Sequence, residues 1–374
     1  MKKSALNAEG GRLRIGQVAP LIESVPPQGY GGTERVVSYL TEELVKLGHE
    51  VTLFASGDSE TSAHLVAPCQ RSLRSVACLD PLAQHLVMLE QVKRYARRLD
   101  VLHFHIDYLH YPWSRQSAVA NLTTLHGRLD PPDLVPLYRE FDDVPLVSVS
   151  HSQRKPLPFA HWRGTVLHGL PENLYREAGG SGGYLAFLGR ISPEKRVDHA
   201  IEIARRAGLP LRIAAKIDRA DQAYYQKQIA PLMRQPHVEL LGELPESGKQ
   251  EFLGNARALL FPIDWPEPFG LVVIEALACG TPVIAFRRGS VPELIEHGRN
   301  GFICDDVDQA VLAVARLDEI SRRECRQSFE RRFTSTRMAT DYVELYRRQL
   351  ENAHVRREPA GARVRDPGDR APGG

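Results

Sequence analysis

Short apolar segments alternate with amphipathic segments along most of the chain, from Leu13 to about Leu317. The apolar segments are rich in Val, Ile, Leu and Phe, and the longer stretches between them, such as residues 33–47, carry apolar residues at helical spacing. This alternation is typical of β-α units that build a parallel sheet. In the first half, the predicted strands are residues 13–19, 51–55, 101–105, 122–125 and 146–149.

The second half of the chain repeats this pattern. A polar, glycine-rich stretch at residues 171–183 separates the two halves and is typical of a linker. We therefore predict two doubly wound, Rossmann-like parallel-sheet domains, at residues 13–172 and 173–335. In the second half, the predicted strands are residues 184–188, 211–215, 238–241, 258–262, 282–285 and 302–304.

The two ends of the chain differ from this pattern. Residues 338–350 have helical spacing with Tyr342, Leu345 and Tyr346 on one side, so this helix needs a surface to dock on, and spacing leaves open which domain supplies it. Residues 353–374 hold four Gly, three Pro and five Arg, which predicts a disordered tail. Residues 1–12 are predicted to be flexible.

Composition narrows the class of protein. The chain has 374 residues, of which 43% are hydrophobic and 25% charged, as in a globular protein. The formal charge of +2 gives no general attraction to nucleic acid. Five cysteines without a C-x-x-C pair, and no signal-peptide or membrane-spanning apolar run, predict a cytoplasmic protein. For the basic stretch at residues 93–100, a solvated surface is favoured over peripheral membrane contact.

The most informative motif surrounds two glutamates, Glu267 and Glu275. The intervening Phe269 and Gly270 lead into a predicted helix that contains Leu271, Val272 and Glu275 and ends at Gly280. Free amides at a helix start attract an anion, and carboxylates accept hydrogen bonds from sugar diols. The motif therefore suits a phosphate flanked by two sugars, as in a nucleotide sugar. Solvated charges that favour a helix start are the alternative.

A second motif places two cations, Arg190 and Lys195, around a strand-to-helix turn. The strand is predicted to end at Gly189, with Ser192 as the helix cap and Pro193 as the first helical residue. Ligands of open α/β sheets bind at such strand ends, where these cations could neutralise a departing diphosphate without a metal. Ordinary surface cations are the alternative.

Two further motifs follow strands in the first half. Gly31 and Gly32 precede a predicted helix capped by Thr33, so that backbone can approach a ligand closely. The dinucleotide fingerprint fails because Glu34 stands where it requires glycine, which disfavours a nicotinamide dehydrogenase. His126 leaves a strand end and could bind a sugar hydroxyl, although a structural histidine is the alternative.

Two metal-like patterns are set aside. His103 and His105 alternate on a predicted strand that Asp107 follows, which is a poor zinc set. Asp306 and Asp308 form the Asp-x-Asp motif of some metal-dependent glycosyltransferases, but here they precede a helical pattern and are interpreted as capping residues. No metal site and no cofactor are predicted.

Taken together, these motifs resemble the family 4 glycosyltransferases, which are retaining, metal-independent enzymes of the GT-B fold. The resemblance extends over residues 13–350 and rests on four features in order: the Gly-Gly-x-Glu loop, the His-Gly pair, the G-R-x-S-P-E-K run, and E-P-F-G-L with a second glutamate at E-x7-E spacing. It implies two domains facing a cleft, and a C-terminal helix, residues 336–352, that returns to the first domain. The His168-Gly169 pair departs from the family, in which Asn-Gly is common.

The resemblance also implies roles for individual residues. Glu267 would contact the donor sugar and Glu275 the nucleotide ribose, while the amides after Phe269, at Gly270, Leu271 and Val272, would bind phosphate. The expected catalytic set is His126, Arg190, Lys195 and Glu267. Gly31 and Gly32 would lie beside the diphosphate, with Glu34 on the acceptor side.

The predicted function is transfer of a sugar from a nucleotide sugar in the second domain to an unidentified acceptor in the first. UDP is the first expectation for the nucleotide. The nucleotide sugar would be a co-substrate and not a cofactor. The acceptor, whether small molecule, saccharide or lipid-linked, is not identified. Two alternatives remain open: a nucleotide-sugar epimerase or hydrolase of the same fold, and a non-catalytic nucleotide-sugar-binding protein.

Overall fold

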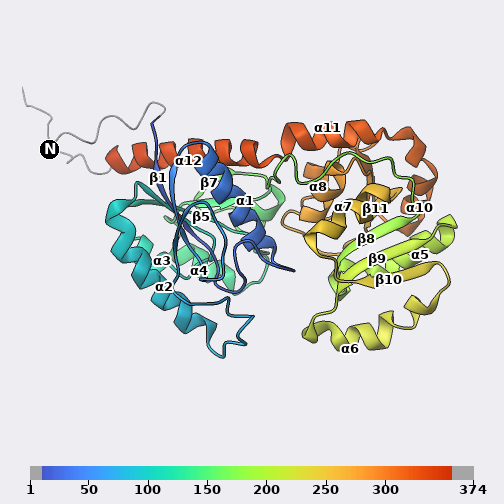
Figure 1. Cartoon of the computed structure of the whole chain (residues 1–374), viewed down its shortest axis with the longest axis horizontal. Helices are drawn as coiled ribbons and strands as arrows, with labels where there is room; N and C mark the ends of the chain where they lie inside the picture. Colours follow the sequence, from blue (N-terminus) through green and yellow to red (C-terminus); the bar gives the residue numbers. More distant parts are fainter. Residues whose placement is uncertain (1–10, 356–374) are drawn as a thin grey trace, which may run out of the picture.

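The computed structural model describes residues 11–355, which form two α/β domains lying side by side (Figure 1). Within this range each domain has one wholly parallel sheet, as the alternation of apolar and amphipathic segments predicts. The first sheet has the strand order β3-β2-β1-β4-β5-β6-β7, and the second has the order β10-β9-β8-β11-β12-β13. Both sheets are therefore doubly wound, and the order reverses between β1 and β4 and between β8 and β11.

The strands of the first sheet are β1 (Arg14–Val18), β2 (Glu50–Phe54), β3 (His64–Val66), β4 (Val101–Phe104), β5 (Ala120–Thr124), β6 (Leu146–Ser148) and β7 (Trp162–Thr165). The strands of the second are β8 (Leu185–Arg190), β9 (Leu211–Lys216), β10 (Val238–Gly242), β11 (Ala258–Phe261), β12 (Val283–Phe286) and β13 (Gly301–Cys304). The helices are α1 (Gly32–Lys46), α2 (Pro81–Tyr95), α3 (Tyr111–Ser114), α4 (Leu134–Glu140), α5 (Val197–Ala207), α6 (Gln222–Tyr224), α7 (Glu246–Asn255), α8 (Leu271–Ala278), α9 (Val291–Leu294), α10 (Val307–Ala315), α11 (Arg322–Arg332) and α12 (Ser335–Val355).

All eleven predicted strands are present, and the structure adds β3 and β7 at the two edges of the first sheet. These two strands are short and only partly buried, so they lack the continuous apolar run that identifies a central strand. Two predicted helix starts are wrong. Helix α1 starts at Gly32 with Gly31 in the cap position, so Thr33 is not its cap. Residues Pro193–Lys195 form only a 3-10 turn, η3, and α5 begins at Val197.

The C-terminal helix α12 packs on the first domain, which answers the question that its spacing left open (Figure 1). Met338, Tyr342 and Tyr346 are buried in one cluster with residues of β1, α1 and β5. The helix continues to Val355, so residues 353–355 do not belong to the predicted tail. The other residues of that tail, and residues 1–10 of the predicted flexible start, lie outside the described part of the chain.

Two chain segments connect the domains, and they run next to each other. The amide of Leu170 donates to the carbonyl of Phe333 at 2.9 Å, and the amide of Ser335 donates to the carbonyl of Leu170 at 2.8 Å. Gly169 permits this approach, because a Cβ atom there would lie 2.2 Å from the carbonyl oxygen of Thr334. The segment at 166–171 and the start of α12 are thus hydrogen-bonded to each other where the chain passes between the domains.

Candidate active site

A cavity of about 480 Å³ opens between the two domains, at the carboxyl ends of both sheets. Its walls come from the segments that follow β1, β5, β8 and β11, which surround the points where the strand orders reverse. Such reversal points leave a crevice above the sheet, and ligands of open α/β proteins bind there. The volume lies in the range of small-molecule sites. Every residue that the sequence singled out as catalytic, donor-binding or acceptor-side lines this cavity.

Helix α8 points its start at the cavity. Gly270 adopts φ of 89°, which glycine tolerates best, and turns the chain from the loop into the helix at Leu271. Phe269 is buried beneath this turn, and Gly270, Leu271 and Val272 line the cavity. The amides at the start of a helix, here those of Leu271 and Val272, have no carbonyl partner in a preceding turn, so they favour an anion. The structure thus has the helix start that the sequence predicted, and Gly280 follows its end at φ of 75°.

Glu275 lies one turn into α8 and is almost fully buried. Its carboxylate accepts a hydrogen bond from Lys249 Nζ of α7 at 2.9 Å. Lys249 also pairs with Glu246 at 3.2 Å, and Glu246 reaches Arg35 of the first domain at 2.5 Å. A chain of alternating charges therefore runs from the predicted ribose-binding glutamate to helix α1. This chain joins the two domains at one end of the cavity.

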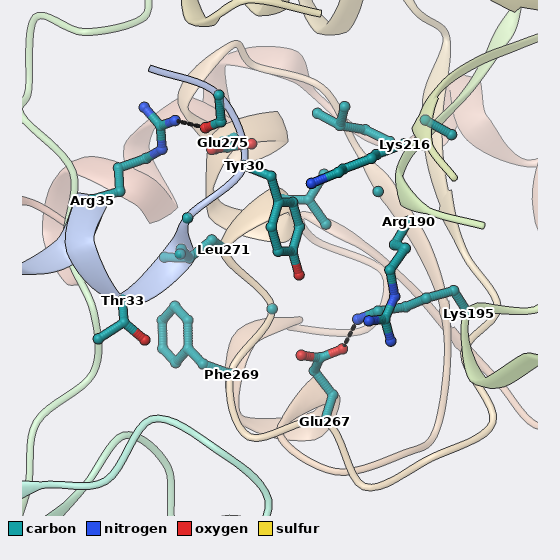
Figure 2. Close-up of a pocket in the computed structure, with 18 of the residues that line it drawn as sticks. Tyr30, Thr33, Arg35, Arg190, Lys195, Lys216, Glu267, Phe269, Leu271 and Glu275 are labelled. Atoms are coloured by element: carbon teal, nitrogen blue, oxygen red, sulfur yellow. Dashed lines mark hydrogen bonds and ion pairs between the residues drawn. The ribbon is translucent and has the colours of Figure 1, made fainter. Parts of the chain in front are cut away.

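Glu267 and Lys195 form an ion pair at the other end of the cavity (Figure 2). The Trp265 indole donates to the same carboxylate at 2.9 Å, and Lys195 Nζ lies 4.9 Å from the centre of the Trp265 ring. The loop that carries Glu267 packs tightly on Gly289, where a Cβ atom would lie 2.3 Å from the Glu267 carbonyl oxygen. Glu267 is thus held from two sides, by a cation and by backbone packing.

Arg190 ends β8 beside Lys216, its register partner at the end of β9. Around the guanidinium stand three carboxylates: Glu194 is hydrogen-bonded to it, Asp221 lies 3.4 Å away and Asp218 3.6 Å away. The two cations predicted from the sequence therefore both carry acidic partners in this structure. An arriving diphosphate would compete with these carboxylates for the cations.

The glycine loop of the first domain reaches over the cavity and brings a residue that the sequence analysis missed. Tyr30 projects into the cavity with its hydroxyl towards Glu267 and Lys195 (Figure 2). Its amide donates to Glu243 of the second domain at 3.1 Å, and Lys216 Nζ lies 5.4 Å from its ring centre. Gly31 packs against Pro27, and a Cβ atom at Gly31 would lie 2.8 Å from the Pro27 ring. The loop therefore connects the two domains directly above the residues predicted to bind the donor.

Glu34 and His126 are the other two predicted residues of the first domain. Glu34 lies in the first turn of α1, and burial raises the pKa of its carboxyl. His126 follows β5, and burial lowers the pKa of its imidazole to about 3, so the ring is neutral at physiological pH. The ring stacks on His168 at 5.3 Å between centres, and His168 in turn meets the edge of Phe269 at 4.7 Å.

The two strand histidines that resemble metal ligands have other partners. His103 bonds to the Tyr346 hydroxyl and to Thr124, while His105 bonds to His126 and to Gln17. Within residues 11–355, no three side chains of His, Cys, Asp or Glu are placed to hold a metal ion. Asp306 caps α10 by accepting from the amide of Gln309 at 2.8 Å, as its interpretation as a capping residue predicts. Asp308 is not a cap: it lies in the first turn of α10 and pairs with Arg206 at 2.7 Å.

Two family models match the chain in tandem. Residues 30–177 match Glycosyltransferase Family 4, and residues 178–334 match Glycosyl transferases group 1. The chain belongs to glycosyltransferase family 4. The resemblance stated from the four motifs is thereby confirmed, and with it the transferase class of the enzyme.

Relatives of this glycosyltransferase agree with the fold. N-acetyl-alpha-D-glucosaminyl L-malate synthase of Bacillus anthracis is 26% identical over 366 residues, covering 84% of this chain and 93% of the relative. The crystal structure of a glycosyltransferase involved in avilamycin A biosynthesis is 27% identical with a TM-score of 0.68, covering 91% of this chain and 98% of that one. Sucrose-phosphate synthase from Thermosynechococcus elongatus, at 17% identity, has a TM-score of 0.77 over 91% of this chain and 100% of that one, which shows the shared GT-B fold.

Of the described helices, none is long and apolar enough to cross a bilayer.

Proposed function

We propose that this glycosyltransferase moves a sugar from a nucleoside diphosphate sugar to an acceptor of unidentified chemistry. UDP is the first nucleoside diphosphate to test. One observation carries the proposal: the start of α8, the Arg190 and Lys195 cations, and the Glu267 and Glu275 carboxylates line a single cavity between the domains. An anion-binding helix start with cations on one side and sugar-binding carboxylates on both sides matches the chemistry of a nucleotide sugar.

The proposed reaction needs positive charge where the diphosphate departs. Arg190, Lys195 and the amides at Leu271 and Val272 would supply it, and fixed charges in a water-poor cavity stabilise a developing anion strongly. We therefore expect transfer without a metal ion. His126 would face the transferred sugar from the first domain, with the Tyr30 loop closing over it. Retention of configuration at the anomeric carbon is expected from the family resemblance.

Binding tests the donor class before any acceptor is known. The melting temperature would be measured with UDP, GDP, ADP, dTDP and NAD, each with and without a chelator. A ligand at 100 times its Kd adds about 2.7 kcal/mol, which corresponds to a shift of a few degrees for a chain of this size. A selective response to one nucleoside diphosphate that a chelator leaves unchanged supports the proposal. A response to NAD alone, or to none of the diphosphates, contradicts it.

Product analysis then separates transfer from the alternatives. With the selected nucleotide sugar and a panel of acceptors, NMR of the product would identify a new glycosidic bond and its configuration. An inverted linkage would refute retention. Release of free sugar or of an epimer as the main product would favour the hydrolase or epimerase, and tight binding without turnover would favour a binding protein.

A further inference from the structure

A buried chain of hydrogen bonds runs from the cavity to the C-terminal helix. His126 Nε2 lies 2.9 Å from His105 Nδ1, and His105 Nε2 lies 2.8 Å from Gln17 Oε1. The amide nitrogen of Gln17 donates to the Tyr346 hydroxyl of α12 at 2.9 Å. Gln17, His105 and Tyr346 are each at most 3% exposed, so water does not share these bonds. The chain thus joins a cavity residue to a helix that comes more than 200 residues later in the sequence.

The sheet explains why these polar groups meet. Gln17 of β1 is the register partner of His103 on β4, and the side chains of His103 and His105 point to the same face because strand residues alternate. That face is the one that α12 covers, where the Tyr346 hydroxyl also lies 2.8 Å from His103 Nδ1. Buried polar groups are costly without partners, so the tyrosine of α12 and the polar strand residues require one another.

The directions of these bonds determine the proton position on each ring. Because the Gln17 amide nitrogen donates to Tyr346, its Oε1 faces His105 and must accept from His105 Nε2. A neutral imidazole donates from one nitrogen and accepts at the other, so His105 Nδ1 is the acceptor. The proton between the two rings therefore belongs to His126 Nε2, which leaves a lone pair on His126 Nδ1. Among the described residues, His126 Nδ1 has no hydrogen-bond partner. It is also not among the buried side-chain nitrogen and oxygen atoms that lack a partner, so it is accessible, and His126 lines the cavity.

We propose that His105 and Gln17 are positioning residues that hold His126 as the Nε2-protonated tautomer, with Tyr346 of α12 fixing the orientation of Gln17. His126 Nδ1 then accepts a hydrogen bond from a hydroxyl of the donor sugar and cannot donate one. This deepens the proposed function, because the sugar-facing role of His126 rests on it. The low pKa of His126 supports the assignment, since a doubly protonated ring could not accept at Nδ1.

The tautomer can be measured without any substrate. The protein would be labelled with ¹⁵N at histidine, and long-range ¹H–¹⁵N spectra recorded between pH 6.5 and 8, with His126 assigned by the loss of its signals in His126→Asn. The expected wild-type spectrum shows a protonated Nε2 and an unprotonated Nδ1. The opposite tautomer in the wild-type protein refutes the proposal, whatever the enzyme transfers.

Variants test the cause of the tautomer. His105→Leu removes the acceptor, and the His126 signals should move to a mixture of tautomers. His105→Asn keeps an acceptor oxygen near the position of Nδ1 and should restore the Nε2-protonated form. His110→Leu is the matched control, since His110 is equally buried and bonded to Ser114 at 2.8 Å and Thr123 at 2.9 Å, outside this chain of bonds. An unchanged His126 spectrum in His105→Leu overturns the positioning role.

Ligand binding separates this proposal from the proposed function. With UDP and UDP-glucose as probes, His105→Leu should weaken UDP-glucose binding about 10-fold, the worth of one hydrogen bond, and leave UDP binding unchanged. Equal weakening of both probes points to a structural role and refutes the proposal. If the wild-type enzyme binds neither probe, the donor assignment fails, while the tautomer measurement still decides the role of His105.

Discussion

Acid should destabilise this protein in a pH window that histidines define. Burial lowers the pKa of His126 to about 3 in the folded chain, whereas an unfolded histidine titrates near 6.5. Between these values the unfolded state binds more protons than the folded state, so the free energy of unfolding falls as the pH falls from about 6.5 towards 3. Burial also lowers the pKa values of His103, His105 and His168, which gives effects of the same sign.

The magnitude follows for His126 alone. One pKa unit corresponds to about 1.4 kcal/mol, and pH 5 lies about 1.5 units below the pKa of the unfolded histidine. We therefore expect His126 to reduce the free energy of unfolding by about 2 kcal/mol between pH 8 and pH 5. Carboxyl groups whose pKa burial raises, such as Glu34, contribute with the opposite sign, and the comparison of a histidine variant with the wild-type chain cancels their contribution.

Urea unfolding followed by tryptophan fluorescence at pH 5, 6, 7 and 8 measures this loss. The wild-type chain is compared with His126→Asn, and with His64→Asn as a control at an exposed histidine. The loss between pH 8 and pH 5 should shrink by about 2 kcal/mol in His126→Asn and stay unchanged in the control. If the free energy of unfolding falls equally between pH 8 and pH 5 in His126→Asn and in the wild-type chain, the argument that neutral His126 destabilises the folded chain in acid is refuted.

Three substitutions test the donor side and the link between the domains. Lys195→Ala should reduce turnover by about 100- to 1,000-fold with the fold intact, because it removes a fixed cation, and turnover near the wild-type rate would dismiss this role. Gly289→Ala should impair turnover, because the added Cβ would displace Glu267. Gly298→Ala is the control: it is also at positive φ but has no atom within 4 Å of the added Cβ, so it should lose a little stability and no activity. Equal activities of the two variants in steady-state assays would contradict this. Arg35→Met keeps the side-chain stem but breaks the pair with α7, and should lower the free energy of unfolding by about 1–3 kcal/mol in urea, an expectation that an unchanged midpoint would overturn.

Central strands and strand-end motifs could be predicted from the sequence because their signals are local. A buried parallel strand needs a continuous apolar run, and the helix start at Leu271 needs Gly270, so both leave a short pattern. The edge strand β3 was missed because its three residues, one exposed and two partly buried, carry no such run. Likewise, Thr33 has a cap-forming side chain, but the chain already turns into the helix at Gly31.

The parts of the site that were missed depend on contacts distant in sequence. Tyr30 is one aromatic residue in a loop, and its meaning appears only when Glu243 and Lys216 of the other domain meet it. His105, directly after β4, resembled a metal ligand, since its spacing from His103 says nothing of Gln17 or α12. Spacing along one segment therefore finds residues that line the cavity, but it does not find the residues that contact and orient them.

The return of α12 to the first sheet determines how such proteins can exchange their second domain by recombination. The second sheet and α5–α11 lie, in chain order, inside the first domain, because β7 precedes them and α12 follows them. Recombination at one point would separate Gln17 and His103 from the tyrosine that satisfies them. A new second domain can enter intact only by two crossovers, one near residues 166–171 and one near 333–336, where the chain segments already lie together. The second domain is thus an insertion in the chain order of the first, and its replacement would leave the polar centre of the first domain undisturbed.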